Sequence, residues 1–561
     1  MKRFFIIFLL ISVLTSPLSG VYAQRENGAS TATATAAAVP VARQVADRIT
    51  AAQLRDYLTF IAADELEGRD TPSRGLDTAA KFIAFNLSRL GLKPAGDNGS
   101  YFQRIALHRY KINSEQSHAE VGNQTYKFGD DFLAVLPPAG KGLPMSASGQ
   151  LVYVGNGWMI KSKNMDAYKG VDVKDKIMVV SGSGLPAGMT RAEIQGTRGV
   201  DWADAPTYAQ MRGAKGIMLM PGFQNLAFWD RIRRNATERG QITVEKFEQQ
   251  QSEPQVPTII ASLGMLNVLF RGEPQSASGL FSHAVAGAPG AAFDLKADKR
   301  AAFTVGGQAA ETMSTQNVVA VLEGSDPVLK NEYVALGAHY DHVGIGAPVG
   351  GDSIYNGADD DGSGTTALLA IAEALAHSTV RPKRSILFVW HCGEEKGLWG
   401  SKYFTQNPTV PLDRVVAQLN IDMIGRSKKE GDTSLVNAAL SGPNEIYVIG
   451  SKMMSTELGE LSERVNNSYL KLSFNYKYDD PKDPERFFFR SDHFNYARKG
   501  IPIIFYFDGT HEDYHQPGDS VEKIDFEKMQ KVTRTIFMTM WELSNAPTRP
   551  RVDKQLPPEL R

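Results

Sequence analysis

The most constraining feature of this sequence is a repeated pattern of apolar strand, loop and helix in its C-terminal half. Four apolar runs are predicted as strands: Tyr333 to Ala338, Ile386 to Trp390, Val415 to Ile421 and Ile501 to Phe507. A helix with one apolar side is predicted over Thr365 to Ala376, between the first two runs. Buried strands that alternate with helices are typical of a mainly parallel sheet covered on both faces. The sequence therefore predicts an α/β fold whose ligands bind outside the carboxyl ends of the strands.

Length and composition restrict the class of protein. A chain of 561 residues is long enough for roughly two or three domains. With 42% hydrophobic and 22% charged residues, wholesale disorder, collagen and coiled coil are excluded. The 61 basic residues nearly balance the 62 acidic ones, which argues against a nucleic-acid partner bound through its phosphates. The only cysteine is Cys392, so an internal disulfide framework is impossible.

The N-terminus is typical of an exported protein. Lys2 and Arg3 precede an apolar run, and Val21-Tyr22-Ala23 forms a small-residue cleavage pattern, so a signal peptide is predicted over residues 1–23. An uncleaved anchor is the alternative, but the run is shorter than the roughly 20 residues that cross a bilayer. No later stretch reaches that length, so we expect no membrane span in the mature chain and a periplasmic or extracellular location. Residues 24–48 are predicted to be a flexible leader rich in Ala and Thr, with order beginning near Thr50.

The middle of the chain is predicted to form a separate small domain. Between about residues 146 and 261, short β-rich runs alternate with Gly, Pro or Asp. These runs are Leu151 to Val154, Lys176 to Val180, Gly216 to Met220 and Pro257 to Ile260. The region has no evident cluster of histidine, cysteine and carboxylate side chains, so a lid or a module that positions substrate is expected.

Groups that can bind a metal follow each strand of the predicted parallel sheet. They are His339 and Asp341 after the first strand, Asp359 to Asp361 in the loop before the helix, Glu394 and Glu395 after the second strand, Asp422 after the third, and Tyr514 with His515 after the last. Imidazole and carboxylate ligands without thiolate fit zinc or a similar divalent ion in an open catalytic site. The set is large enough for two ions about 3.5–4 Å apart. Of two adjacent glutamates, one can bind the metal while the other acts as the general base.

Each of these residues also has a simpler interpretation. Asp359 to Asp361 could form a helix N-cap or a lone calcium loop, and Glu394 with Glu395 could flank a helix start. A histidine such as His339 taken alone is more often a hydrogen-bonded loop residue than a ligand. The remaining histidines near the motifs are interpreted as lying behind the ligands or at the surface; they are His342, His391, His493 and His511. Cys392 is expected to be a packed, inert thiol, and Asp492 is expected to support the wall of the site.

Six strings in order carry a resemblance to a known family. GAHYDHVG, NGADDDGSG, CGEEKGLWGS, NIDMIG, SDHF and YHQPGDS look like the motifs of the co-catalytic zinc aminopeptidases, whose relatives include glutamate carboxypeptidases and glutaminyl cyclases. DELEGR and NGSYFQ resemble the N-terminal segment of that family, and DAYKGVDVKDKIMVV with RGAKGIMLM resembles a protease-associated domain. The resemblance implies a zinc-exopeptidase fold with a catalytic domain over 49–135 and 296–546, an inserted β-rich domain over 136–295 and a Pro-rich tail over 547–561.

The resemblance also implies a role for each site residue. His339 and Asp422 would hold one zinc ion, Glu395 and His515 the other, and Asp360 would bridge both. Glu394 would be the general base, Asp341 would orient the His339 imidazole, and Tyr514 could donate its O–H to the oxyanion.

The activity implied is that of a secreted di-zinc aminopeptidase acting on peptides, with a metal-activated water and Glu394 as base. The alternatives are a carboxypeptidase, a glutaminyl cyclase of one metal, or a receptor-like binding protein of the same fold. A non-catalytic relative would be expected to lose ligands, and all of them are present here, which favours an enzyme. Side-chain preference depends on loops such as Tyr478 to Arg490, and the oligomeric state stays open.

Overall fold

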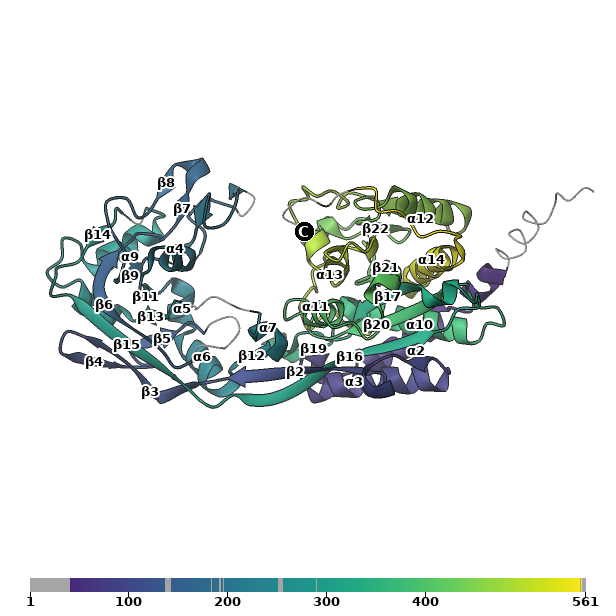
Figure 1. The fold of residues 1–561 in the computed structure, drawn as a ribbon, viewed down its shortest axis with the longest axis horizontal. Coiled ribbons are helices and arrows are strands. Elements are labelled where there is room, and N and C mark those ends of the chain that lie inside the picture. The colour runs from purple at the N-terminus through teal and green to yellow at the C-terminus, as the bar shows by residue number, and fades with distance from the viewer. Residues whose placement is uncertain are drawn as a thin grey trace, which may run out of the picture.

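The computed structural model describes residues 41–136, 143–182, 184–190, 193–194, 196–250, 256–288, 290–554 and 556. The predicted signal peptide, the leader up to residue 40 and most of the end of the tail lie outside these residues. The described chain forms two lobes (Figure 1). The chain passes between them where β2 (Phe102–Tyr110) continues into β3 (Ile112–Val121) and where β15 (Arg300–Gly307) leads back into β16 (Glu311–Leu322).

The larger lobe is built on a ten-stranded mixed sheet with the order β12-β2-β16-β20-β17-β21-β24-β22-β23 and β1 beside β16. Besides β2 and β16, its strands are β1 (Lys93–Pro94), β12 (Gln241–Val244), β17 (Tyr333–His339), β20 (Ser385–His391), β21 (Val415–Ile421), β22 (Glu445–Ile449), β23 (Ser473–Asn475) and β24 (Ile503–Phe507). β20, β17, β21 and β24 are parallel neighbours. They correspond to the four apolar runs of the sequence, because strands buried on both faces must be apolar throughout.

Helices cover both faces of this sheet, which confirms the predicted fold class. One face packs against α2 (Ala51–Ile61), α3 (Arg74–Arg89), α10 (Gly364–Ala376), α12 (Thr456–Ser468) and α14 (Phe526–Asn545). The other face packs against α11 (Trp399–Gln406) and α13 (His493–Ala497). The start of α2 follows its sequence signal, since the Thr50 side chain accepts the backbone N–H of Gln53 at 3.2 Å.

The smaller lobe contains a nine-stranded sheet. With β3 and β15, its strands are β4 (Gln124–Lys127), β5 (Phe132–Ala134), β6 (Met145–Tyr153), β9 (Ile177–Val180), β11 (Gly216–Leu219), β13 (Thr258–Ala261) and β14 (Phe293–Asp294). Its helices include α4 (Ala205–Arg212), α5 (Phe223–Ala227), α6 (Trp229–Arg234), α8 (Leu263–Leu269) and α9 (Ala277–Val285), while α7 (Glu245–Glu248) follows β12 near the junction. The four predicted β-rich runs are the parallel neighbours β6, β9, β11 and β13.

The strands of the smaller lobe extend on both sides of the range 136–295 that was predicted for the inserted domain. β3 begins at Ile112 and β15 ends at Gly307, and the two strands pair antiparallel. Along β3, buried positions alternate with exposed polar ones over part of the strand. A strand with one solvated face gives a weaker sequence signal than a continuous apolar run, and the bounds of the inserted domain stay a prediction.

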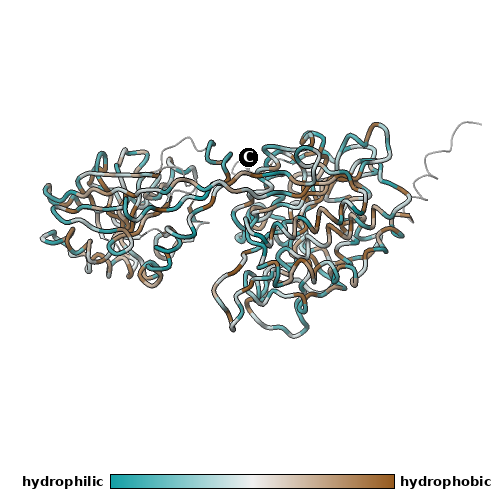
Figure 2. Tube along the Cα trace, turned by 90° about the horizontal axis from the view of Figure 1, so that it is seen from below, coloured by the Kyte–Doolittle hydropathy of each residue, from teal (hydrophilic) through white to brown (hydrophobic). Residues whose placement is uncertain are grey.

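Ordered structure also begins earlier than residue 50. Residues 41–46 are helical, and Ala42, Val45, Ala46 and Ile49 are buried in the main core. These apolar residues recur at helical spacing, so one side of the helix packs against the core. The Ala-rich composition had suggested a flexible leader up to residue 48. Figure 2 shows apolar segments gathered inside each lobe. No helix within the described ranges is long and apolar enough to cross a membrane.

Candidate active site

The predicted metal-binding residues meet at one edge of the large sheet. His339 is the last residue of β17, Asp422 directly follows β21, and Glu394 with Glu395 follows β20. Asp360 lies in the segment Ala358–Ser363 before α10, and His515 lies in the loop after β24. The carboxyl ends of parallel neighbours necessarily lie at the same edge, so strands distant in sequence deliver these side chains to one place.

Asp360 stands between two histidines. Its Oδ1 lies 3.2 Å from His339 Nε2, and its Oδ2 lies 3.1 Å from His515 Nε2. On the first side, Asp422 Oδ1 is 3.6 Å from His339 Nε2. On the second side, Glu395 Oε2 is 3.1 Å from His515 Nε2. The carboxylate therefore faces two sets of ligands, one with each of its oxygens.

Two groups of side chains among the described residues could hold a metal ion. They are His339, Glu394 and Asp422, and His342, Asp360 and Glu395. The first group includes Glu394, which the sequence assigned to proton transfer rather than to ligation. The second group includes His342, which the sequence interpretation did not count among the ligands.

His342 is the functional candidate that sequence reasoning missed. Its side chain is fully buried, and its Nδ1 lies 2.9 Å from Glu395 Oε1 and 3.8 Å from Asp360 Oδ2. Its ring centroid is 5.6 Å from that of His515. The available signal was its position three residues after His339, in the loop that leaves the same strand.

The residues present fit a divalent metal. Asp360 Oδ2, Glu395 Oε1 and His515 Nε2 are buried atoms without a hydrogen-bond partner. Carboxylates taken out of water are costly unless they are paired or coordinate a metal. The donors at this edge are imidazole nitrogens and carboxylate oxygens, which is the ligand chemistry of catalytic zinc.

The pKa values of the two adjacent glutamates are shifted in opposite directions. Burial, together with the neighbouring Glu395 and Asp422 carboxylates, raises the pKa of Glu394 well above its usual value. Burial and the Asp360 charge also oppose ionisation of Glu395, but the neighbouring imidazoles of His342 and His515 lower its pKa to about 2. Neighbouring carboxyl groups whose pKa values are pushed apart can serve as proton carrier and permanent anion.

Two aspartates hold His339 from behind. Its Nδ1 lies 3.1 Å from the backbone carbonyl oxygen of Asp341 and 3.7 Å from the Asp341 carboxylate. The nearer partner is thus the backbone, while the Asp341 carboxylate accepts the backbone N–H of Glu394 at 3.1 Å. Asp361 accepts the backbone N–H of His339 at 3.2 Å. Asp341 therefore connects the predicted ligand to the predicted base.

A relay of hydrogen bonds fixes Asp422. The Ser491 hydroxyl donates to Asp422 Oδ2. Asn420 Nδ2 donates to Ser491 Oγ at 2.9 Å, and Gln418 Nε2 donates to Asn420 Oδ1 at 3.1 Å. Gln418 and Asn420 lie on β21 itself. The SDHF string contained the signal for Ser491, but the sequence alone gave no reason to connect it to Asp422.

Tyr514 closes one side of the site. Its ring stacks on His515 with centroids 4.0 Å apart, and its hydroxyl accepts a hydrogen bond from Arg490 Nη2 at 3.4 Å. Tyr514 and Arg490 line the same cavity as Glu394. The apolar wall of this cavity is formed by Met423, Phe487, Phe505 and Phe507.

The other polar residues near the motifs have structural partners. His391 Nδ1 lies 3.3 Å from Asp492 Oδ2 and its Nε2 lies 3.0 Å from the Tyr496 hydroxyl. His511 Nε2 lies 3.2 Å from Asp359 Oδ2. Cys392 is fully buried, and burial raises the pKa of its thiol, which fits an inert packed side chain.

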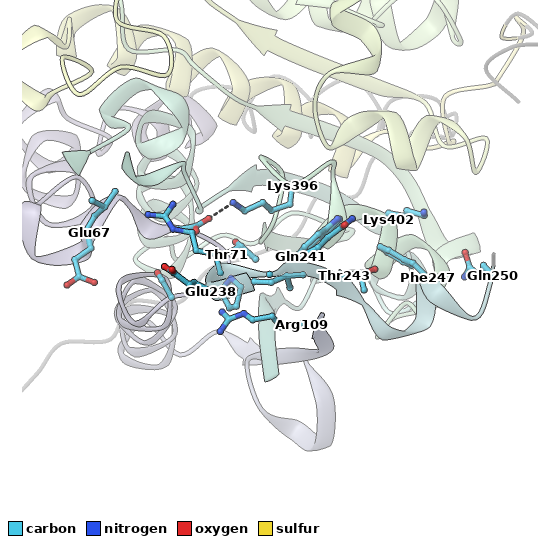
Figure 3. Close-up of a pocket in the computed structure, with 18 residues that line it drawn as sticks. Glu67, Thr71, Arg109, Glu238, Gln241, Thr243, Phe247, Gln250, Lys396 and Lys402 are labelled. Carbon is cyan, nitrogen blue, oxygen red and sulfur yellow. Dashed lines mark ion pairs between the residues drawn. The ribbon is translucent and has the colours of Figure 1, made fainter. Parts of the chain in front are cut away.

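A larger cavity of about 1230 Å³ lies elsewhere, near the junction of the lobes (Figure 3). Charges of both signs line it, and Lys396 forms an ion pair with Asp70 at 2.7 Å. The described residues that line it include no histidine, cysteine or candidate metal ligand. The candidate residues His339, Asp360, Glu394 and Asp422 line the smaller cavity at the strand ends instead.

Comparison with known proteins agrees with this geometry. Residues 317–540 match the family model described as Peptidase family M28. The matched range contains all of the candidate ligands. Over this range the chain is similar to peptidase family M28.

Relatives of the M28 segment include fungal proteins. A "Probable zinc metalloprotease" of Pyrenophora tritici-repentis is 30% identical over 270 residues, which are 43% of this chain and 53% of that protein. "Leucine aminopeptidase 2" of Trichophyton rubrum is 27% identical over 273 residues, covering 44% of this chain and 49% of the relative. The chain thus spans about half the length of the curated relatives it matches.

The fold extends beyond the M28 segment. The solved structure titled "Aminopeptidase from Aneurinibacillus sp. strain AM-1" aligns with a TM-score of 0.50 at 17% identity, covering 92% of this chain and 98% of that one. At this identity the likeness concerns the fold alone.

Proposed function

We propose that this chain is an exported aminopeptidase that holds two zinc ions and hydrolyses the first peptide bond of a peptide. The observation that carries the proposal is the Asp360 carboxylate, whose oxygens face His339 on one side and His515 on the other. A carboxylate shared between two ligand sets is what a pair of metal ions requires. The name of the Trichophyton rubrum relative supports aminopeptidase over other peptidase activities.

These contacts support the following ligand sets. His339 and Asp422 would hold one zinc ion, Glu395 and His515 the other, with Asp360 shared and His342 beside the second set. Zinc in such a site lowers the pKa of a water molecule and polarises the carbonyl of the scissile bond.

Glu394 is the residue suited to move the proton. It lines the active-site cavity, and its backbone N–H is held by the Asp341 carboxylate. It takes the proton of the attacking water and then hands it to the leaving amine, so that one carboxyl group serves as base and acid in turn. Tyr514, on the same cavity wall, donates its O–H to the oxyanion that forms at the carbonyl.

The test is to ask which end of a peptide shortens. Zinc-loaded protein is incubated with four versions of one peptide, in which the N-terminus is free or acetylated and the C-terminus is free or amidated, and the products are identified by mass spectrometry. We expect loss of the N-terminal residue, and only from peptides with a free amine. Shortening from the C-terminus would indicate a carboxypeptidase, and loss of ammonia from an N-terminal glutamine would indicate a glutaminyl cyclase.

Export is a separate part of the proposal and rests on the N-terminal segment. N-terminal sequencing of the protein from a native host should find Gln24 as the first residue, in the periplasm or the medium. A mature protein that begins at Met1 inside the cell would contradict export without affecting the proposed chemistry.

A further inference from the structure

Arg490 is the one arginine or lysine among the described residues that line the active-site cavity. Its guanidinium carbon lies 4.8 Å from the centroid of the Phe487 ring, and Nη2 donates to the Tyr514 hydroxyl. Its remaining N–H groups form no ion pair with any carboxylate of the described chain, and the side chain is exposed. A stacked guanidinium is held in place, and its planar fork stays available for a ligand.

The chemistry of this guanidinium favours a carboxylate. Arginine binds carboxylates through two parallel hydrogen bonds, and such charge-assisted bonds are shorter and stronger than neutral ones. The rest of the cavity wall is apolar, as at Phe505 and Phe507, belongs to the candidate ligand set, or carries an uncharged hydroxyl, as at Ser491, Thr510 and Tyr514. The guanidinium of Arg490 is therefore free to bind a carboxylate of the substrate.

The position of Arg490 limits where that carboxylate can be. Under the proposed function, on which this inference rests, the Tyr514 hydroxyl points at the scissile carbonyl, and Arg490 lies just beyond the same hydroxyl. In a dipeptide the α-carboxylate is separated from the scissile carbonyl carbon by only two atoms, a distance of roughly 3–4 Å. In a longer peptide an uncharged amide occupies this position.

We propose that Arg490 binds the free α-carboxylate of the residue after the scissile bond, so that dipeptides are the preferred substrates. Longer peptides lose this contact while keeping every contact of the N-terminal residue. The apolar wall of the cavity then selects the side chain of the N-terminal residue of the substrate, and Arg490 selects the length of the peptide.

The test compares kcat/KM for leucyl-alanine with kcat/KM for its C-terminal amide, using the zinc-loaded full chain. We expect the free acid to exceed the amide by about tenfold or more, as for one charge-assisted contact. Arg490→Ala should bring this ratio close to one, and Arg490→Lys should keep part of it. Arg486→Ala is the matched control, because Arg486 also stacks on a phenylalanine, Phe489, but does not line the cavity; it should keep the parental ratio.

The outcomes separate this inference from the proposed function. Equal rates on acid and amide in the parent protein overturn the inference and leave the aminopeptidase intact. If Arg490→Ala lowers kcat/KM for leucyl-alanine and for its amide by the same factor, the inference is also overturned, because Arg490 would then act only through Tyr514. A preference for leucyl-aspartate amide over leucyl-alanine would assign Arg490 to an acidic side chain instead. If the parent does not cleave a leucyl anilide, which has no carboxylate, the proposed aminopeptidase function itself has failed, whatever the ratio of acid to amide.

Discussion

The carboxylate of Asp519 accepts the backbone N–H of Asp360 at 3.0 Å. It also accepts the backbone N–H of Asp359, and Arg426 Nη1 lies 3.8 Å from it. The same guanidinium binds Asp513 at 2.9 Å. Since Asp513 and Asp519 lie on either side of His515, these contacts tie the loop that carries one candidate ligand to the backbone of the shared carboxylate.

Replacing Asp519 should therefore weaken metal binding. In Asp519→Asn the neutral amide accepts fewer backbone N–H groups. The side chains of Asp360 and His515 are then held less firmly in the positions in which both would bind the metal. We expect the zinc affinity of one of the two sites to fall by about tenfold to a hundredfold, as when a partner behind a ligand is changed. Zinc content after dialysis against a series of zinc buffers measures this. Glu522→Gln, an exposed change in the same loop, should leave both affinities unchanged, and an unaltered zinc curve for Asp519→Asn would refute the argument.

The role of Glu394 can be separated from metal binding. Glu394→Gln keeps the size of the side chain but removes its ability to carry a proton. We expect kcat to fall by a factor of about a hundred to ten thousand, while zinc content stays near that of the parent. If the variant retains most of its activity, another group transfers the proton; if it loses one equivalent of zinc, Glu394 is a ligand, as its place beside His339 and Asp422 allows.

The strands of the large sheet and the residues at their carboxyl ends could be predicted from the sequence because the strands are buried. β20 and β21 are buried along their whole length, and β17 is buried at every residue after Tyr333, so their apolar runs were visible without any alignment. Their carboxyl ends fix the neighbourhood of His339 and Asp422. The roles of the individual ligands came from the family resemblance and stay predictions.

The missed features depend on contacts that no local pattern encodes. A histidine three residues after a strand, such as His342, cannot be told from an ordinary loop residue in the sequence. Only the structure shows that its Nδ1 lies close to Glu395 Oε1. The contact between Arg490 and Tyr514 joins two loops, and its partners are polar residues with no periodicity. β3 and β15 gave only a weak sequence signal because they keep one face toward solvent over part of their length, and the bounds of the inserted domain stay a prediction.

Tyr514 should affect the chemical step more than binding. Tyr514→Phe keeps the ring that stacks on His515 and removes only the hydroxyl. We expect kcat to fall by about a hundredfold to a thousandfold, as when one oxyanion donor is lost, with a much smaller change in KM. Steady-state kinetics on a leucyl anilide measures both constants. A change confined to KM would mean that the hydroxyl contacts the ground state and not the oxyanion.

His493 gives a prediction for stability that is independent of the metal site. Its ring is fully buried, stacks on Phe505 and places Nε2 2.8 Å from the carbonyl oxygen of Phe488. Burial lowers the pKa of His493 to about 3, from 6.5 in the unfolded chain.

The sign of the pH effect follows from these two pKa values. Below pH 6.5 the unfolded chain binds a proton at His493 that the folded chain refuses, so acid favours unfolding; above pH 6.5 the group has no effect. The free energy of unfolding should fall by about 1.4 kcal/mol for each pH unit between 6.5 and 3 on account of this residue. His493→Phe keeps the stacking and removes the titration, so urea unfolding at several pH values should show a shallower acid slope than in the parent. The exposed His283, changed to Gln, serves as the control and should keep the parental slope. Equal slopes for His493→Phe and the parent would show that the folded protein admits a proton at this position.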